Sequence, residues 1–423
     1  MEDDPNFNVY NVRNKKTSLR QIKNVNKYQK VRHFPSAFQL SNKSHFWFNM
    51  SRLRCKFPKD FNISPISYVL AQKDENEEFE MQRQLNPSSL WICKPINGTD
   101  AKGIKIVDGQ THVPNRLGIR NSYIASNYID NPHLINGYKY DFRVFALVTS
   151  FNPLKVYIYQ DGLVCFCSEA YSTSGLCIKN RTSHFTNNSV NWHNRDKVSL
   201  NWNFKQYRDE CEKLGINFDD IWKQIKDVVV KTLLTAEGHV TSALNEHPSA
   251  RKACFEMLGF DIMLDDQMKA WVLEVNDWPQ NYMEDEVTQN FTDRRVCDEL
   301  TLLGIQPYDK LKVQSQPAED TKLRQFKKSM SIQDLMFKDG GMLKGYENLT
   351  EDELDMLLDL EDEASRCNRF ERIFPVPSTM DYYSQFFEHK RYENVLMMTY
   401  LRSTEKAKNK ILKNHKRAFP TVV

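Results

Sequence analysis

The side chains best suited to chemistry lie in one stretch of the second half of the chain. Glu274 and Asn276 belong to the run WVLEVN, and Asp261 belongs to the preceding apolar run CFEMLGFDIML. Because side chains alternate along a strand, Glu274 and Asn276 point to one face, and an antiparallel partner could bring Asp261 beside them. Two carboxylates and an amide oxygen suit a hard cation such as Mg²⁺. The alternative is three solvated side chains at strand ends, which the spacing alone does not exclude.

Two further charged groups stand in apolar surroundings. Lys94 ends the strand-like run LWICKP, and a turn-rich loop with Lys102 and Gly103 follows it. Cations so placed can hold phosphates, but the loop is neither a Walker A motif nor GxGxxG, so a surface turn is the alternative. Asp141 and Arg143 share one face of YDFRVFALVTS, where charges cost free energy unless they are paired or used. A structural ion pair is the alternative for them.

The elements that must position these residues follow from periodicity and turn chemistry. Residues 254–276 are predicted to form two strands around the turn DDQMK, and YDFRVFALVTS and KVYIYQ two more around FNPL. Apolar residues at helical spacing predict a helix within residues 215–237, and residues 73–84 are expected to form a polar surface helix. Thr350 and Glu353 match a capping box, which predicts the start of a helix.

Composition limits the class of protein. The 423 residues are 40% hydrophobic, which is enough for a sizeable core in two or three domains. A net charge of +3 is too small to indicate a nucleic-acid partner. The start MEDDPNFNVY lacks the pattern of a secretory signal. The sequence contains no run of about 18 apolar residues, so no membrane span is expected. Nine scattered cysteines without a CxxC pair indicate neither a zinc site nor a disulfide framework, and free thiols in a reducing cytosol are expected.

The two ends of the chain differ from its centre. Residues 1–27 are rich in Asn and Lys and predict a flexible arm, and compact sequence begins near Tyr28. From Gln314 the composition becomes polar and charged. The segment 404–418 has six Lys or Arg against one Glu and predicts a basic helix. Such a helix could steer the protein toward an acidic partner, and a solvated surface helix is the alternative.

Nine motifs stand in a fixed order along the chain. They are HFPSAF, FPKDF, WICKP, KGI, YIDNPHLINGYKYDFRV, DGLVCFCSEAYS, HFTNNSVN, CFEMLGFDIMLDD and WVLEVN. Together they resemble the tubulin tyrosine ligase-like family, and most of all its polyglutamylase branch. LEDEASRCNRFERIFP resembles the segment that follows the catalytic core in that branch. The resemblance runs from about Tyr28 to Tyr382.

This resemblance implies an α+β protein with an ATP-grasp fold, in which two lobes clamp ATP, and with a helical, basic C-terminal extension. The implied division places a flexible N-terminal arm at 1–27 and an N-terminal and central lobe at 28–122. A C-terminal lobe with the metal site would occupy 123–313. A charged helical extension would occupy 314–423, with microtubule binding as its candidate role.

The resemblance also implies ATP and Mg²⁺ as cofactors and assigns residues to them. The metal ligands would be Asp261, Glu274 and Asn276, and the catalytic residues Asp141, Arg143 and Glu274. The residues implied to bind ATP are Lys94, Lys102, Gly103, Ser126, Asn127, Tyr128, Ile129, Lys139, Asp141, Thr186 and Asn187. Those implied to meet the incoming amino acid are Cys165, Ser189 and Lys197.

The implied reaction adds free glutamate to glutamate side chains in the C-terminal tails of tubulin. The acceptor carboxylate would take the γ-phosphoryl group of ATP, and the incoming amino group would attack the acyl phosphate. Tubulin or microtubules would be the partner, with neither nucleic acid nor membrane. The implied location is the cytoplasm and cytoskeleton, with the cilium axoneme or basal body as candidate sites.

Several departures from the family pattern fall on the amino-acid side of the implied site. Cys165 stands where the family usually has an Arg that grips the incoming amino acid, and Cys cannot imitate its bidentate hydrogen bonding. Asn188 and Trp192 replace a Tyr and a Lys, and Trp278, Pro279 and Gln280 replace Ser-Pro-Ser. Three alternatives therefore stay open: an impaired or inactive microtubule-binding member, a ligase for another amino acid, or a ligase for a non-tubulin acidic protein.

Overall fold

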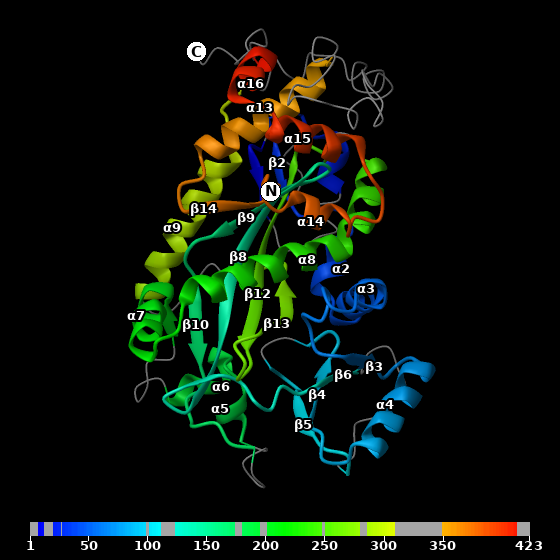
Figure 1. The fold of residues 1–423 in the computed structure, drawn as a ribbon, viewed down its shortest axis with the longest axis vertical. Coiled ribbons are helices and arrows are strands. Elements are labelled where there is room, and N and C mark those ends of the chain that lie inside the picture. Colours follow the sequence, from blue (N-terminus) through cyan, green and yellow to red (C-terminus); the bar gives the residue numbers. More distant parts are fainter. Residues whose placement is uncertain are drawn as a thin grey trace.

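The structure is a computed structural model with an α+β fold built on two sheets (Figure 1). The predicted α+β class is therefore confirmed. The residues described are 7–11, 20–26, 28–98, 101–110, 123–173, 180–194, 201–247, 250–279, 286–308 and 349–412.

Two long antiparallel strands, β8 (Tyr138–Phe151) and β12 (Cys254–Leu264), form the centre of the larger sheet. Along β8 the side chains of Phe142 and Val144 are buried, while Asp141 and Arg143 point to the other face. The predicted hairpin is confirmed, because β12 pairs antiparallel with β13 (Ala270–Asn276). The other described strands of this sheet are β1 (Val9–Tyr10), β2 (Lys30–Arg32), β7 (Leu134–Ile135), β9 (Leu154–Tyr159), β10 (Leu163–Phe166), β11 (Asn201–Asn203) and β14 (Phe370–Phe374).

The smaller sheet lies beside the larger one, at the lower right of Figure 1. Its described strands run in the order β3 (Ser67–Val69), β6 (Tyr123–Asn127), β4 (Trp91–Pro95) and β5 (Lys105–Val107). Helix α4 (Lys73–Leu85) covers it and buries Phe79 edge-on against Trp91, with ring centroids 5.1 Å apart. The polar helix and the LWICKP strand predicted from the sequence are both present.

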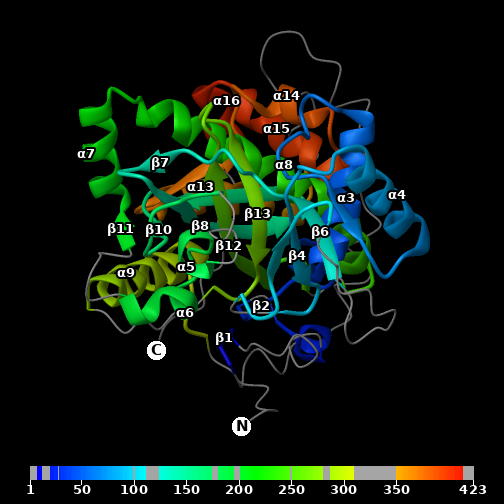
Figure 2. The same ribbon diagram turned by 90° about the horizontal axis from the view of Figure 1, so that it is seen from below.

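Helix α8 (Phe218–Asn245) crosses one face of the larger sheet (Figures 1 and 2). Gly215 ends the preceding helix in a left-handed conformation at φ +69°, and the Asn217 side chain then accepts a hydrogen bond from the Asp219 N–H. These two signals fix where α8 begins. The remaining described helices before residue 349 are η1 (Ile22–Asn24), α2 (Phe38–Ser41), α3 (Lys43–Lys56), α5 (Arg181–His184), α6 (Asn188–Asn191), η4 (Trp192–Asn194), α7 (Phe204–Leu214) and α9 (Glu286–Leu303).

The C-terminal region is built into the larger sheet, because β14 pairs antiparallel with β9. The carboxylate of Glu363 adds three hydrogen bonds, from Lys155 (2.6 Å), Tyr157 (2.7 Å) and Thr149 (3.1 Å). The helices here are α13 (Glu351–Ser365), α14 (Met380–Ser384), α15 (Tyr392–Arg402) and α16 (Glu405–Leu412).

The predicted basic helix at 404–418 is described only as α16, since residues 413–423 lie outside the described part. The basic extension and the four-part division of the chain stay predictions. Among the described residues, no helix is both long and apolar enough to cross a membrane.

The cap of α13 gives a first testable prediction. The Thr350 Oγ1 accepts from the Glu353 N–H (3.3 Å), and the Glu353 carboxylate accepts from the Thr350 N–H (2.7 Å). Thr350→Ala should lower the free energy of unfolding by about 1 kcal/mol, because the Glu353 N–H at the start of the helix loses its side-chain acceptor. Chemical denaturation measures this loss. Glu351→Ala, at an exposed position of the same turn, should change stability by less than about 0.5 kcal/mol, and an equal effect of both variants would contradict the capping role.

Candidate active site

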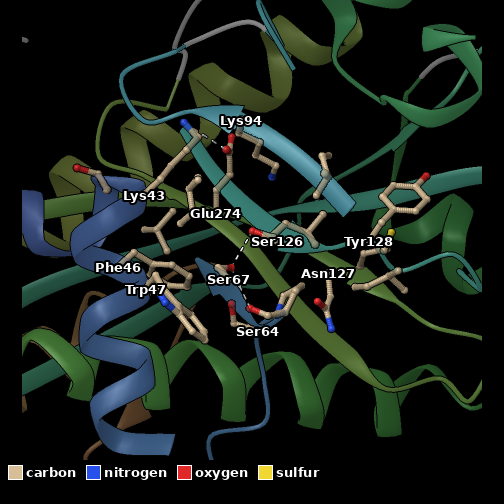
Figure 3. A pocket seen from close by; sticks show the side chains of 18 of the residues that line it. Lys43, Phe46, Trp47, Ser64, Ser67, Lys94, Ser126, Asn127, Tyr128 and Glu274 are labelled. Atoms are coloured by element: carbon tan, nitrogen blue, oxygen red, sulfur yellow. Dashed lines mark hydrogen bonds and ion pairs between the residues drawn. The ribbon is translucent and has the colours of Figure 1, made fainter. Parts of the chain in front are cut away.

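A cleft lies where strands β4 and β6 of the smaller sheet face β13 and helix α3 (Figure 3). It contains about 710 Å³ of empty space, including its open mouth. The residues that line it are Leu40, Ser41, Lys43, Phe46, Trp47, Ser64, Pro65, Ser67, Ile92, Lys94, Ile124, Ser126, Asn127, Tyr128, Ile129, Lys139, Met263, Leu273, Glu274 and Val275.

Four of the residues predicted to bind ATP form one wall of this cleft, namely Ser126, Asn127, Tyr128 and Ile129. The pairing of β6 with both β3 and β4 holds this segment in place. The hydroxyl of Ser126 adds a hydrogen bond of 2.7 Å to Ser67 on β3. The wall is therefore a firmly placed, mixed polar and apolar surface.

Two lysines line the cleft from different sheets, Lys94 half-buried and Lys139 buried. Lys94 lies near the end of β4 and close to Glu274 (Figure 3), and desolvation lowers its pKa although Glu274 opposes the shift. Lys139, on β8, donates a 3.0 Å hydrogen bond to the Tyr128 hydroxyl, which is also 2.7 Å from Nδ1 of His184. Burial lowers the pKa of Lys139 as well. A bound anion would stabilise both ammonium groups, because desolvated cations gain most from a nearby negative charge.

The acidic residues predicted to converge do so at the edge of the cleft. Asp261 on β12 is directly opposite Glu274 on β13, and the Asn276 Nδ2 donates to Asp261 Oδ2 at 3.3 Å. Arg143 lies opposite Asp261 on β8 and forms two hydrogen bonds with its carboxylate, Nε to Oδ1 at 2.5 Å and Nη2 to Oδ2 at 3.1 Å. Asp141, on β8 itself, is the third carboxylate near this guanidinium. Arg143 therefore balances the charge of three carboxylates on neighbouring strands, Asp141, Asp261 and Glu274.

Burial and charge act against each other on these groups. Burial raises the pKa of Asp261 to about 7 although Arg143 opposes it, and burial also raises the pKa of Asp141. Burial would raise the pKa of Glu274 too, but Lys94 and Lys43 outweigh it, so that pKa is lowered. Glu274 is consequently a carboxylate at neutral pH, and it is the acid that faces the cleft.

Other predicted residues lie around this centre without lining the cleft. The Thr186 hydroxyl donates to the Asp141 carboxylate, and Cys165 on β10 is directly opposite Asp141, where burial raises the pKa of its thiol. Asn187 and Ser189 are exposed near α6, and Lys102 and Gly103 are exposed in the turn before β5. Lys197 lies outside the described residues, as does Gln280.

Comparison with known proteins adds independent information. The model of the family described as "Tubulin-tyrosine ligase family" matches residues 20–311. The chain belongs to the tubulin-tyrosine ligase family. The resemblance found in its motifs is thus confirmed.

Named relatives lie in the glutamylase branch of the family. The chain is 32% identical to the human tubulin monoglutamylase TTLL4, over 89% of its own length and 33% of the relative. It is 30% identical to the Caenorhabditis briggsae tubulin polyglutamylase ttll-4, over 89% of its length and 64% of the relative. It is 27% identical to the mouse tubulin polyglutamylase TTLL5, over 90% of its length and 30% of the relative. The chain thus spans 30–64% of the length of these relatives.

Asp261, Glu274 and Asn276 at the edge of the cleft, which we call the acidic edge, fit the Mg²⁺ that the family implies. Asp261, Glu274 and Asn276 offer hard oxygen atoms from adjacent strands, which is the donor chemistry that Mg²⁺ prefers. Among the described residues, no three His, Cys, Asp or Glu side chains are close enough together to hold a metal alone. That agrees with the habit of Mg²⁺, which takes most of its ligands from water and phosphate oxygens.

The structure adds one cation that the sequence did not indicate. Lys43 begins helix α3 behind the N-cap Asn42, and its Nζ lies 3.9 Å from Glu274 Oε2 and 3.1 Å from the Gly98 carbonyl oxygen. It therefore reaches from α3 to both the acidic edge and the loop after β4 (Figure 3). No local pattern marks Lys43, because only the folded chain places it opposite Glu274. His184, behind Tyr128, was missed for the same reason.

Proposed function

We propose that the protein is an ATP- and Mg²⁺-dependent ligase with an ATP-grasp fold, which adds glutamate to glutamate side chains in the C-terminal tails of tubulin. The observation that carries the proposal is the cleft between two sheets, which is lined by Lys94, Lys139 and Glu274, with Lys94 near the carboxylate of Glu274. Relatives named as tubulin monoglutamylases and polyglutamylases support tubulin as the acceptor and glutamate as the added amino acid.

ATP would lie in the cleft with its adenine against the wall formed by residues 126–129. Lys94 and Lys139 would neutralise its phosphates, with Lys102 and Gly103 in the phosphate loop and Thr186 and Asn187 near the nucleotide. Asp261, Glu274 and Asn276 would hold Mg²⁺, which supplies positive charge beside the phosphates when bound. Asp141, fixed by Thr186, would help to orient the transferred group.

The chemistry then needs little from the protein beyond positioning and charge. An acceptor carboxylate oxygen attacks the γ-phosphorus, the bond to ADP breaks, and an acyl phosphate forms. The α-amino group of the incoming glutamate attacks the acyl carbon, phosphate leaves, and a proton is lost from the amine. Lys94, Lys139 and Arg143 stabilise the negative charge of these steps, and the walls of the cleft restrict access of water.

The proposed partners are tubulin or microtubules and free glutamate, with neither nucleic acid nor membrane required. The proposed location is the cytoskeleton in the cytoplasm. A ciliary axoneme or basal body stays a prediction.

The test incubates the purified protein with microtubules, Mg²⁺ and ATP and adds glutamate, glycine or tyrosine in turn. Masses of the tubulin tails are then recorded. The proposal predicts additions of glutamyl residues only with glutamate, and none without ATP. Cosedimentation with microtubules in the absence of ATP, with no mass change for any amino acid, would instead support a non-catalytic microtubule-binding protein.

Cys165, in place of the family's arginine, favours the second candidate function, a non-catalytic microtubule-binding protein. It also gives a prediction that separates this candidate from the ligase. The thiol lies directly opposite Asp141 and near Arg143, whose guanidinium is already bonded to Asp261. If the site is an active but weakened ligase, Cys165→Arg should raise the rate of glutamate addition about 10-fold or more, because a guanidinium can bind the α-carboxylate. Steady-state rates over a range of glutamate concentrations measure this gain. Cys165→Met serves as the control of similar bulk, and an equal gain in both variants would contradict the explanation.

A further inference from the structure

The segment that leaves β13, residues 277–279, is fastened by three contacts directly after Asn276. The Ser41 hydroxyl of α2 donates to the Asp277 carboxylate. The Trp278 ring lies 4.5 Å from the guanidinium carbon of Arg32 on β2. Pro279 packs over Gly259 of β12, where an added Cβ would lie only 3.2 Å from the Pro279 Cβ.

Arg32 is a buried cation for which Trp278 supplies a partner. Its side chain donates to the Met257 carbonyl oxygen at 3.3 Å and to Asn11 Oδ1 at 3.4 Å, and both bonds are long. Its Nε is buried without a hydrogen-bond partner among the described residues, and the buried carboxylate that its charge influences, Glu299, is shared with Arg295 at 3.1 Å. A buried guanidinium with one unbonded nitrogen and a shared carboxylate gains from stacking on an indole ring.

His33 lies against the same ring from the next position of the chain. Its imidazole is 5.8 Å from the Trp278 ring and is held by the buried Glu256 carboxylate, 2.7 Å from Nδ1. The second carboxylate oxygen of Glu256 accepts from the Phe34 N–H at 3.0 Å. Arg32 and His33 together form the surface on which the Trp278 ring packs.

We infer that Arg32 is a positioning residue for the acidic edge, where Mg²⁺ is proposed to bind, and that it acts through Trp278. The packing of Trp278 on Arg32 and His33 fixes the direction in which the chain leaves β13. It thereby fixes the orientation of the Asn276 amide against Asp261. Pro279 and the Arg143 side chain both lie over Gly259, since a Cβ there would also lie 3.3 Å from Arg143 Cδ. The segment therefore runs close to Arg143, the partner of Asp261, as well. The inference rests on the proposed function, because it assigns Arg32 to the same nucleotide site.

The experiment measures binding of a fluorescent ATP analogue to the full chain as a function of free Mg²⁺. Arg32→Met and Trp278→Leu should each raise the Mg²⁺ concentration for half-maximal binding about 10-fold, as expected for groups that orient metal ligands. The double variant should be no worse than either single variant, because both changes remove the same contact.

Two control variants separate positioning from general stability. Trp278→Phe keeps an aromatic face and should stay near the wild-type midpoint. Arg208→Met removes another stack of 4.5 Å, between Arg208 and Phe218, and should leave the midpoint unchanged. Should Arg32→Met fail to fold, Trp278→Leu carries the test, since Trp278 is only half-buried.

The possible failures are distinguishable. Unmoved Mg²⁺ midpoints in folded Arg32→Met and Trp278→Leu, or shifts that simply add in the double variant, overturn the positioning role alone. Absence of Mg²⁺-dependent binding in the wild type overturns the proposed function and this inference with it.

Discussion

Replacing Glu274 by Gln is expected to lower the rate of glutamate addition by about 10³-fold while leaving the fold intact. Glu274 is the carboxylate that faces the cleft, and Lys94 and Lys43 keep its pKa low, so it carries a full negative charge at neutral pH. Gln has the same shape without that charge, and the proposed metal edge would lose one of its two carboxylates. Single-turnover rates at saturating ATP, with a titration of Mg²⁺, measure the effect.

The matched control is Glu371→Gln on β14, which removes a carboxylate paired with Lys226 at 2.9 Å away from the cleft. Its rate should stay within about twofold of the wild type, because it touches no part of the proposed site. A Glu274→Gln enzyme with more than a tenth of the wild-type rate would show that the assignment of Glu274 is wrong.

The second large effect is expected from Arg143→Met, which should lower the free energy of unfolding by about 3 kcal/mol in the absence of Mg²⁺. Arg143 forms both hydrogen bonds to Asp261, whose side chain is only 12% exposed. Its loss leaves Asp261, Asp141 and Glu274 as neighbouring carboxylates without their shared cation. Added Mg²⁺ should restore part of the stability, because it replaces the missing positive charge.

Chemical denaturation with and without Mg²⁺ measures both parts of this prediction. Arg402→Met, which breaks an exposed ion pair with Asp381, is the control and should change stability little in either condition. If Arg143→Met is as stable as the wild type, the carboxylates do not depend on Arg143, and the charge balance described for the edge is wrong.

Local patterns in the sequence indicated that Glu274 and Asn276 share a face that Asp261 could join, and the three residues do lie together. Alternation along WVLEVN places Glu274 and Asn276 on one face, and the turn DDQMK makes the two flanking strands antiparallel neighbours. Both depend only on residues close in the chain, so Asp261 was expected opposite them. The capping box at Thr350 and Glu353 was predictable for the same reason.

Contacts between distant segments could not be predicted in this way. Arg143 meets Asp261 across 118 residues, because β8 and β12 are neighbours in the sheet, and no local signal indicates that pairing. Lys43 reaches Glu274 only because α3 packs beside β13 at the cleft. The charged composition after Gln314 gave no sign of β14, which joins the larger sheet through β9.

The most direct test of the central claim follows an oxygen atom through the reaction. A glutamate-rich tubulin tail peptide carrying ¹⁸O in its side-chain carboxylates is incubated with the enzyme, ATP, Mg²⁺ and glutamate. The account predicts a peptide heavier by glutamyl residues and one ¹⁸O atom in the released phosphate for each glutamate joined directly to a labelled side chain, since the acceptor oxygen leaves with the phosphoryl group. An unmodified peptide, or addition accompanied by phosphate without ¹⁸O, would contradict it.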